Sequence, residues 1–158
     1  MDAENVDFVI AAWQDGGVWN VESLPARTAQ SVDAALQALA AHPADAAVLG
    51  MLSITDDYFI VIRTQAGQHR FLLSDGGAAL EDDLAEQIVE RLELDVEDVE
   101  ELVPVGDLSI VADFGMSATE LSTLAADDEM FPDEILSAIA QRIGFGDQFD
   151  SSIESTDA

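Results

Sequence analysis

Two histidines limit the nucleophilic and metal chemistry open to this chain. His42 stands directly before Pro43, which ends a predicted helix, and His69 lies in a predicted β-hairpin. A hydrolase triad needs a nucleophile beside a base and an orienting acid, and no serine here stands in a Gly-x-Ser-x-Gly sequence. The chain has no cysteine, which excludes thiol catalysis, disulfides and Cys-ligated zinc. Surface or capping roles are therefore favoured for both histidines.

Two glycine-rich places raise the question of phosphate binding. They are Asp15-Gly16-Gly17 and Asp75-Gly76-Gly77, and neither has a Walker lysine or the Rossmann spacing. The second lies between a predicted strand and a predicted helix, where an anion could meet helix N–H groups. A simple strand-to-helix turn is the favoured interpretation.

Acidic clusters are the remaining candidates for chemistry. They are Glu81-Asp82-Asp83, residues 95–101 and Asp127-Asp128-Glu129. None has the alternating oxygen ligands, glycine and terminal glutamate of a calcium loop, so a solvated face is favoured, with weak divalent-metal binding as the alternative. Two carboxylates could also carry out acid–base catalysis, but among 33 acidic residues the sequence nominates no pair.

The charge balance is extreme: five arginines and no lysine stand against 33 acidic residues, which gives a net charge of −28. Binding to phosphates needs clustered lysine or arginine, so nucleic acids and anionic membranes are disfavoured as partners, and basic proteins are favoured. Plain solvation, genome composition or adaptation to salt would explain the same charge. We predict no cofactor and no metal.

The N-terminal sequence, MDAENVDFVIAAW, lacks the basic region of a signal peptide. The longest apolar stretch, AAVLGMLSI, is far shorter than the roughly 20 residues of a membrane span. We therefore expect a cytoplasmic protein.

The elements that would position any site alternate between hairpins and helices. Apolar runs on both sides of Asp15-Gly16-Gly17 predict a hairpin, and Ser31 is a plausible N-cap for a helix that ends before Pro43. Three strand candidates follow: AAVLGMLSI, YFIVIRT and HRFLLS. YFIVIRT is apolar on both faces and is placed centrally in the sheet. Leu80, Leu84, Ile88 and Leu92 then repeat every four residues and predict one face of an amphipathic helix.

The last third of the chain reads as mainly helical. Residues 106–114 suit either a helix or a strand, with a helix favoured. Ser117 and Glu120 form a capping-box pattern, and Pro132, Arg142 and Gly144 mark the start, last turn and end of a closing helix. The predicted units are a sheet domain (1–94), an acidic connector (95–104), a C-terminal helical segment on the same core (105–149) and a frayed tail (150–158).

The predicted fold is therefore α+β: an antiparallel sheet of about five strands with helices on one face and a C-terminal helical segment. The order β-β-α-β-β-β-α also occurs in longin- and profilin-like domains, which is an analogy of topology. Trp13 and Trp19 flank the first turn and are predicted to pack as a cross-strand pair, with an exposed binding platform as the alternative.

Several segments together resemble one bacterial family. They are LGMLSITDDYFIVIR, FLLSDGGAALEDDLAEQIVERL, GDLSIVADFGMSATEL and FPDEILSAIAQRIGFGDQF. In their order and spacing they resemble the tRNA adenosine deaminase-associated proteins, over roughly Phe8 to Phe149. The resemblance implies association with the deaminase that makes inosine in tRNA, and it carries over no catalytic residue. The chain does not resemble the deaminase itself, which needs His-x-Glu and Pro-Cys-x-x-Cys.

We therefore predict a non-catalytic, regulatory binding protein that contacts tRNA adenosine deaminase or another basic protein. The candidate docking residues lie on the C-terminal helices, where core packing explains them equally well: Phe131, Ile135, Ile139, Arg142, Phe145 and Phe149. The first alternative is a carboxylate-based enzyme, or a protein that binds a divalent metal or small ligand. The second is a structural module that self-associates through an exposed sheet edge.

Overall fold

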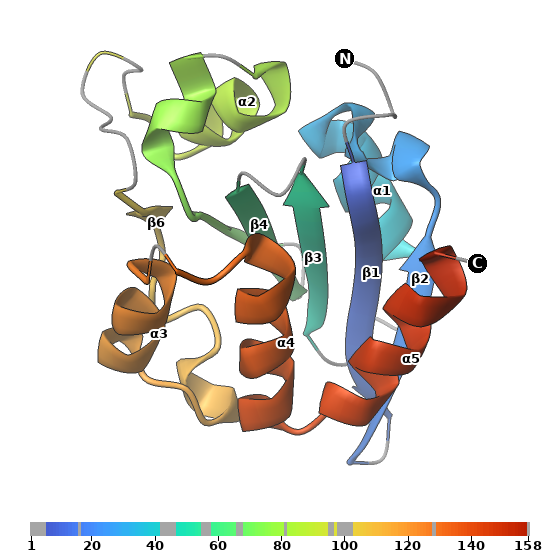
Figure 1. Cartoon of the computed structure of the whole chain (residues 1–158). Helices are drawn as coiled ribbons and strands as arrows, with labels where there is room; N and C mark the ends of the chain where they lie inside the picture. The colour runs from blue at the N-terminus through green and yellow to red at the C-terminus, as the bar shows by residue number, and fades with distance from the viewer. Residues whose placement is uncertain are drawn as a thin grey trace.

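A single antiparallel sheet organises the fold. The computed structural model describes residues 6–15, 17–41, 47–54, 58–65, 68–80, 82–94, 97, 103–127 and 129–157. Within them six strands lie in the order β2-β1-β3-β4-β5-β6 (Figure 1). The strands are β1 (Val6–Asp15), β2 (Val18–Leu24), β3 (Val48–Ile54), β4 (Tyr58–Gln65), β5 (Gln68–Leu73) and β6 (Val105–Gly106). The predicted α+β class is confirmed, and the sheet has one more strand than expected because β6 pairs with the end of β5.

The predicted hairpins and strand positions agree with the structure. Asp15 pairs with Val18 across the first turn, and Gly17 has the positive φ, 84°, that a short turn requires. β4 lies between β3 and β5, as its two-sided apolar sequence predicted.

Helices cover both faces of the sheet: the helices predicted within the sheet domain lie on one face, and the predicted C-terminal helical segment covers the other. On one face lie α1 (Val32–Ala40) and α2 (Asp83–Arg91), and on the other lie α3 (Ala118–Ala125), α4 (Pro132–Ile143) and α5 (Gly146–Asp157) (Figure 1). The reason lies in the alternation of side chains along β4. Phe59 and Val61 point to one face and Ile60 and Ile62 to the other, so both faces need an apolar cover.

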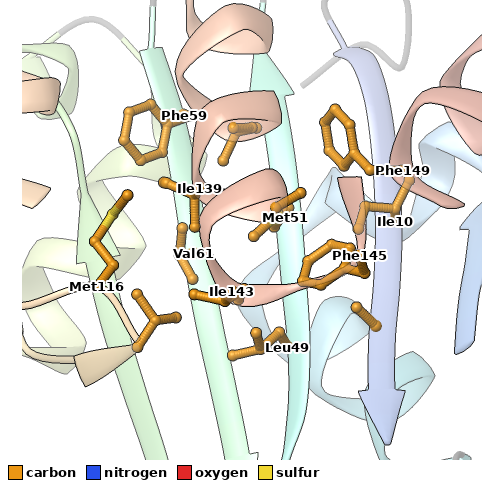
Figure 2. Packing of buried hydrophobic residues seen from close by; sticks show 14 of the residues in the cluster. Ile10, Leu49, Met51, Phe59, Val61, Met116, Ile139, Ile143, Phe145 and Phe149 are labelled. Carbon is orange, nitrogen blue, oxygen red and sulfur yellow. The ribbon is translucent and has the colours of Figure 1, made fainter. Parts of the chain in front are cut away.

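The core beneath the C-terminal helices holds most of the buried aromatic rings of the described residues. Figure 2 shows Ile139 and Ile143 of α4 facing Met51 of β3 and Val61 of β4. Phe149 of α5 meets Phe8 of β1 edge to face, with ring centroids 5.6 Å apart. The last two helices therefore close this face of the sheet.

Capping residues set the helix ends as predicted. The Ser31 side chain accepts a hydrogen bond from the backbone N–H of Ala34, and Ser117 and Glu120 form the capping box of α3. Pro132 is the first residue of α4, and Gly144 ends that helix with a φ of 118°.

The two tryptophans do not form the predicted cross-strand pair. In the register of β1 and β2, Trp13 pairs with Asn20 and Trp19 with Gln14. Positions one apart in register point to opposite faces of a sheet. Trp13 accordingly packs against the α1–α2 core, while Trp19 contacts Phe145, with ring centroids 4.8 Å apart.

Leu80 is not part of the predicted apolar helix face. It lies in the 3₁₀ turn η3 (Gly76–Leu80), because α2 begins only after its N-cap Asp82. The apolar face of α2 consists of Leu84, Ala85, Ile88 and Val89, and the Leu80 side chain is 61% exposed.

The predicted helix over residues 106–114 is also wrong. Val105–Gly106 forms β6, and after several turns Ala112–Phe114 forms the short 3₁₀ helix η5. Gly106 and Gly115, at the two ends of the segment, both have positive φ, and hydrogen bonds from Arg63 and Arg70 hold the residues between them. The tail expected to fray from residue 150 is helical through Asp157, because α5 restarts at Gly146 and Phe149 anchors it in the core. Most of the predicted acidic connector lies outside the described residues.

Candidate functional site

The structure separates the six predicted docking residues into buried and exposed groups. Ile135, Ile139, Phe145 and Phe149 are buried in the core against the sheet. A partner cannot contact these four without opening the core.

Phe131 and Arg142 remain on the surface. Phe131 precedes α4, and its side chain is 60% exposed. Arg142 lies in the last turn of α4, donates to the backbone oxygen of Gly115 at 3.0 Å and pairs with Glu120 at 3.1 Å. Arg142 therefore ties α4 to the start of α3.

Arg63 of β4 fixes the irregular segment before α3. Its guanidinium donates to the carbonyl oxygen of Ile110 at 2.8 Å and to both carboxylate oxygens of Asp113, at 2.5 and 2.8 Å. It also lies over the Phe114 ring, 4.8 Å from the centroid. The Arg63 side chain is only 7% exposed, so these contacts replace the water that a buried cation loses.

The hydrogen bond from Arg63 holds the pKa of Asp113 below its usual value, although partial burial opposes this shift. Asp113 thus stays ionised at neutral pH and keeps its bidentate contact with the guanidinium.

Arg70 makes a second attachment beside the first. Arg63 and Arg70 are direct partners across β4 and β5, and Arg70 donates to Asp107 at 2.5 Å and to the Ser109 carbonyl at 3.1 Å. Burial acts to raise the pKa of Asp107, but hydrogen bonds from Ser109 and Arg70 outweigh it and lower that pKa. We call Arg63–Asp113 and Arg70–Asp107 together the arginine clamp. It holds residues 107–114 against the sheet.

The sequence analysis missed the arginine clamp. The sequence did contain a sign of it, since two of only five arginines stand in the adjacent strands YFIVIRT and HRFLLS. The register of that hairpin, with Gln65 opposite Gln68, places the two arginines side by side.

Two of the hollows on the described surface bear on ligand binding. The first, about 320 Å³, is lined by Arg63, Gln65, Gln68 and Arg70, but the arginine clamp already engages its cations. The second, about 650 Å³, lies between β2 and α1. Its charged lining residues are Glu22 and Arg27, one of each sign, so it does not favour a ligand of either charge.

The other predicted sites have simple structural positions. His69 is exposed on β5, and His42 lies outside the described residues. Asp75 accepts a hydrogen bond from the Gly77 N–H at 2.9 Å, so Asp75-Gly76-Gly77 forms a turn closed by its own side chain.

Over the described ranges, no three histidine or acidic side chains are grouped so that they could hold a metal ion. Among these residues no helix is long and apolar enough to cross a lipid bilayer.

Comparisons with known proteins agree on one family. The family model described as "Rv3753c-like tRNA adenosine deaminase-associated protein" matches residues 7–146, from β1 to the start of α5. The chain is 32% identical over 151 residues to Protein Rv3753c of Mycobacterium tuberculosis (strain ATCC 25618 / H37Rv). That alignment covers 93% of this chain and 87% of the relative. No solved structure matches the chain.

Proposed function

The chain belongs to the Rv3753c-like tRNA adenosine deaminase-associated protein family, and from this premise we propose that it is a non-catalytic accessory protein that binds a basic macromolecule. The proposed partner is tRNA adenosine deaminase. An enzyme that acts on tRNA needs a basic surface to meet the phosphate groups, and the net charge of −28 would attract that same surface. We also propose a cytoplasmic location, because that is where a partner that acts on tRNA would be met.

The observation that carries the proposal is that most of the arginines are already paired with acidic residues of the same chain. Arg63, Arg70, Arg91 and Arg142 each form an ion pair with a carboxylate of this chain. Four of the five cations are therefore neutralised locally, and the surplus of acid faces outward. Such a surface steers basic molecules toward it and repels nucleic acid.

The non-catalytic part of the proposal is supported by the roles of the polar groups. Among the described residues, every fully buried side-chain nitrogen or oxygen has a hydrogen-bond partner within the chain. The buried Arg63 and Ser74 both hold backbone groups in place, since Ser74 accepts from the Phe59 N–H at 2.9 Å. The hydrogen bonds of both groups therefore serve the fold.

Binding of the purified chain to purified deaminase from the same organism tests the proposal. Calorimetry at about 0.05 M and about 1 M salt is the direct measurement, because the screening length falls from more than 10 Å to about 3 Å over that range. We expect binding at low salt, a much weaker interaction at high salt, and competition between this protein and tRNA for the enzyme. A failure to bind at either salt concentration would overturn the proposed partner.

A further inference from the structure

Three of the four exposed charged residues of α2 are acidic. Leu84, Ala85, Ile88 and Val89 are buried against the sheet, and Asp83, Glu86 and Glu90 alternate with them on the exposed side. Glu93 follows the C-cap residue Leu92 and is also exposed. These acids are three or four residues apart, a spacing at which like charges repel and weaken a helix. Plain solvation would be served as well by mixed charges, without that repulsion.

The cation of α2 does not relieve this repulsion. Arg91 points sideways to α1, where its guanidinium pairs with Asp33. Among the described residues, none of Asp83, Glu86, Glu90 and Glu93 takes part in an ion pair.

Several acidic residues in and beside α3 and α4, on the C-terminal side of the molecule, have different roles. Glu120 pairs with Arg142, and Asp127 accepts a hydrogen bond from the Glu129 N–H at 3.0 Å. Glu134 accepts from the Phe131 N–H at 3.0 Å and so caps α4. These carboxylates stabilise their own segments through hydrogen bonds or an ion pair, whereas among the described residues the Glu86 and Glu90 side chains make neither contact.

Exposed apolar side chains lie at both ends of the same helix. Leu80 precedes the N-cap of α2 and is 61% exposed, and Leu94 follows its C-terminus and is 43% exposed. Val103 is also exposed, and its carbonyl accepts a hydrogen bond from Gly76, the first residue of η3. Three of the five large apolar side chains that are exposed in the described structure therefore lie in or beside the segments around α2.

The end of α2 keeps an acid where glycine fits best. Glu93 has a φ of 61° and is the only described non-glycine residue with positive φ. Hydrogen bonds from Glu93 N–H to Glu90 and from Leu94 N–H to Val89, at 3.0 and 3.1 Å, form a Schellman motif. The motif holds Glu93 and Leu94 fixed at the end of the acidic side.

We propose that this surface, defined as Asp83, Glu86, Glu90 and Glu93 with Leu80 and Leu94 at its ends and called the α2 face, is where a basic protein docks. The inference rests on the proposed function and names the surface that it uses. The partner that fits is a protein surface of lysine and arginine side chains flanked by apolar ones, because it complements both the charge and the exposed leucines. In Figure 1 α2 lies apart from α3, α4 and α5, so a partner bound there leaves the C-terminal helices uncovered.

A triple neutralisation tests the α2 face against a matched control. The test variant is Glu86→Gln with Glu90→Gln and Glu93→Gln. The control variant removes the same charge on the C-terminal side by Glu129→Gln, Asp133→Asn and Asp147→Asn. With the deaminase as probe at low salt, we expect the test variant to lose affinity by about tenfold or more, and the control by less than about threefold. The test variant should fold at least as stably as the wild type, since it relieves repulsion.

The apolar part of the α2 face has its own variant, Leu80→Ser. It should lower the affinity while the dependence of binding on salt stays as in the wild type, because no charge changes. Equal losses in the test and control variants would overturn the α2 face and leave the proposed function standing.

A second probe keeps the inference testable if the wild type does not bind the deaminase, a result that would remove the proposed partner. The probe is a synthetic amphipathic helical peptide with arginine on one face and leucine spaced three or four residues apart beside it, titrated while the backbone amide resonances of this protein are followed by NMR. Shifts centred on residues 82–94 would support the α2 face. Shifts spread equally over α3, α4 and α5 would overturn it.

Discussion

Substitution of Arg63 by methionine should destabilise the fold although no catalytic role is involved. Methionine is of comparable length and apolar, so the change removes the hydrogen bonds and charge of the arginine clamp while largely filling its space. The carbonyl of Ile110, a fully buried residue, would lose its donor, which costs about 1–3 kcal/mol. The contact with the Phe114 ring contributes about 0.5–1 kcal/mol.

The ion pair with Asp113 adds less than its two short hydrogen bonds suggest. Asp113 is 57% exposed, so water screens the pair and can solvate the carboxylate after the substitution. Removing a buried cation also offsets part of the loss. We therefore expect Arg63→Met to lower the free energy of unfolding by about 2–3 kcal/mol, which for a chain of this size lowers Tm by roughly 4–12 °C.

Urea denaturation followed by tryptophan fluorescence and circular dichroism measures this loss. Trp19 is a suitable reporter because its ring lies 5.1 Å from that of Phe114. The matched control is Arg91→Met, whose exposed pair with Asp33 should contribute less than about 1 kcal/mol. If Arg63→Met changes the stability by less than about 0.5 kcal/mol, or no more than the control, the arginine clamp does not stabilise the fold as we have argued.

The same variant has a pH signature. The pKa of Asp113 is lower in the folded state than in the unfolded chain, where it lies near 3.9. Its contribution is therefore present above about pH 4 and is lost as the pH falls through the lower, folded value. The stability difference between wild type and Arg63→Met should shrink over that acidic range and stay constant between about pH 5 and 8.

Three further substitutions test the backbone and the core. Glu93→Gly should raise the free energy of unfolding by about 0.5–1 kcal/mol, because glycine adopts positive φ without strain; a loss of stability in urea denaturation would contradict the Schellman geometry. Gly106→Ala should cost more than about 2 kcal/mol, since an added Cβ would lie 2.3 Å from the Phe71 carbonyl oxygen; a Tm equal to that of the wild type would show that β6 does not pack as described. Phe149→Ala should cost about 3–5 kcal/mol and speed amide exchange in α5, and unchanged exchange there would argue against Phe149 as the anchor of that helix.

Local signals in the sequence predicted most of the elements correctly. Ser31, Ser117, Pro132 and Gly144 each act within one turn of chain, so their effects on helix ends can be read from neighbouring residues. The first hairpin depends on Gly17 in the same way.

The errors concern features that depend on distant parts of the chain. Trp13 and Trp19 differ by an even number of positions, but the two-residue turn shifts their register by one and sends them to opposite faces. The segment 107–114 has little regular structure of its own and takes its conformation from Arg63 and Arg70, whose contacts with it span 50 and 39 residues of sequence.

The candidate docking residues show the same limit. Periodicity identifies an apolar stripe such as Ile135 and Ile139, but it does not distinguish a stripe that packs on its own sheet from one that faces a partner. The acids of α2 were visible as sequence, but only their position on the described surface, beside exposed Leu80 and Leu94, separates them from acids that cap helices.

The covering of the sheet by α4 and α5 has a consequence for synthesis on the ribosome. Five of the six strands are complete once Leu73 has been made, yet one whole apolar face then lacks the helices that shield it. Translation must add some seventy further residues before Phe145 and Phe149 emerge, and at about 5–20 residues per second this takes several seconds. During that interval the nascent hairpins expose Phe8, Met51 and Val61, so chaperone occupancy should be greatest for ribosome-bound chains that end before α4.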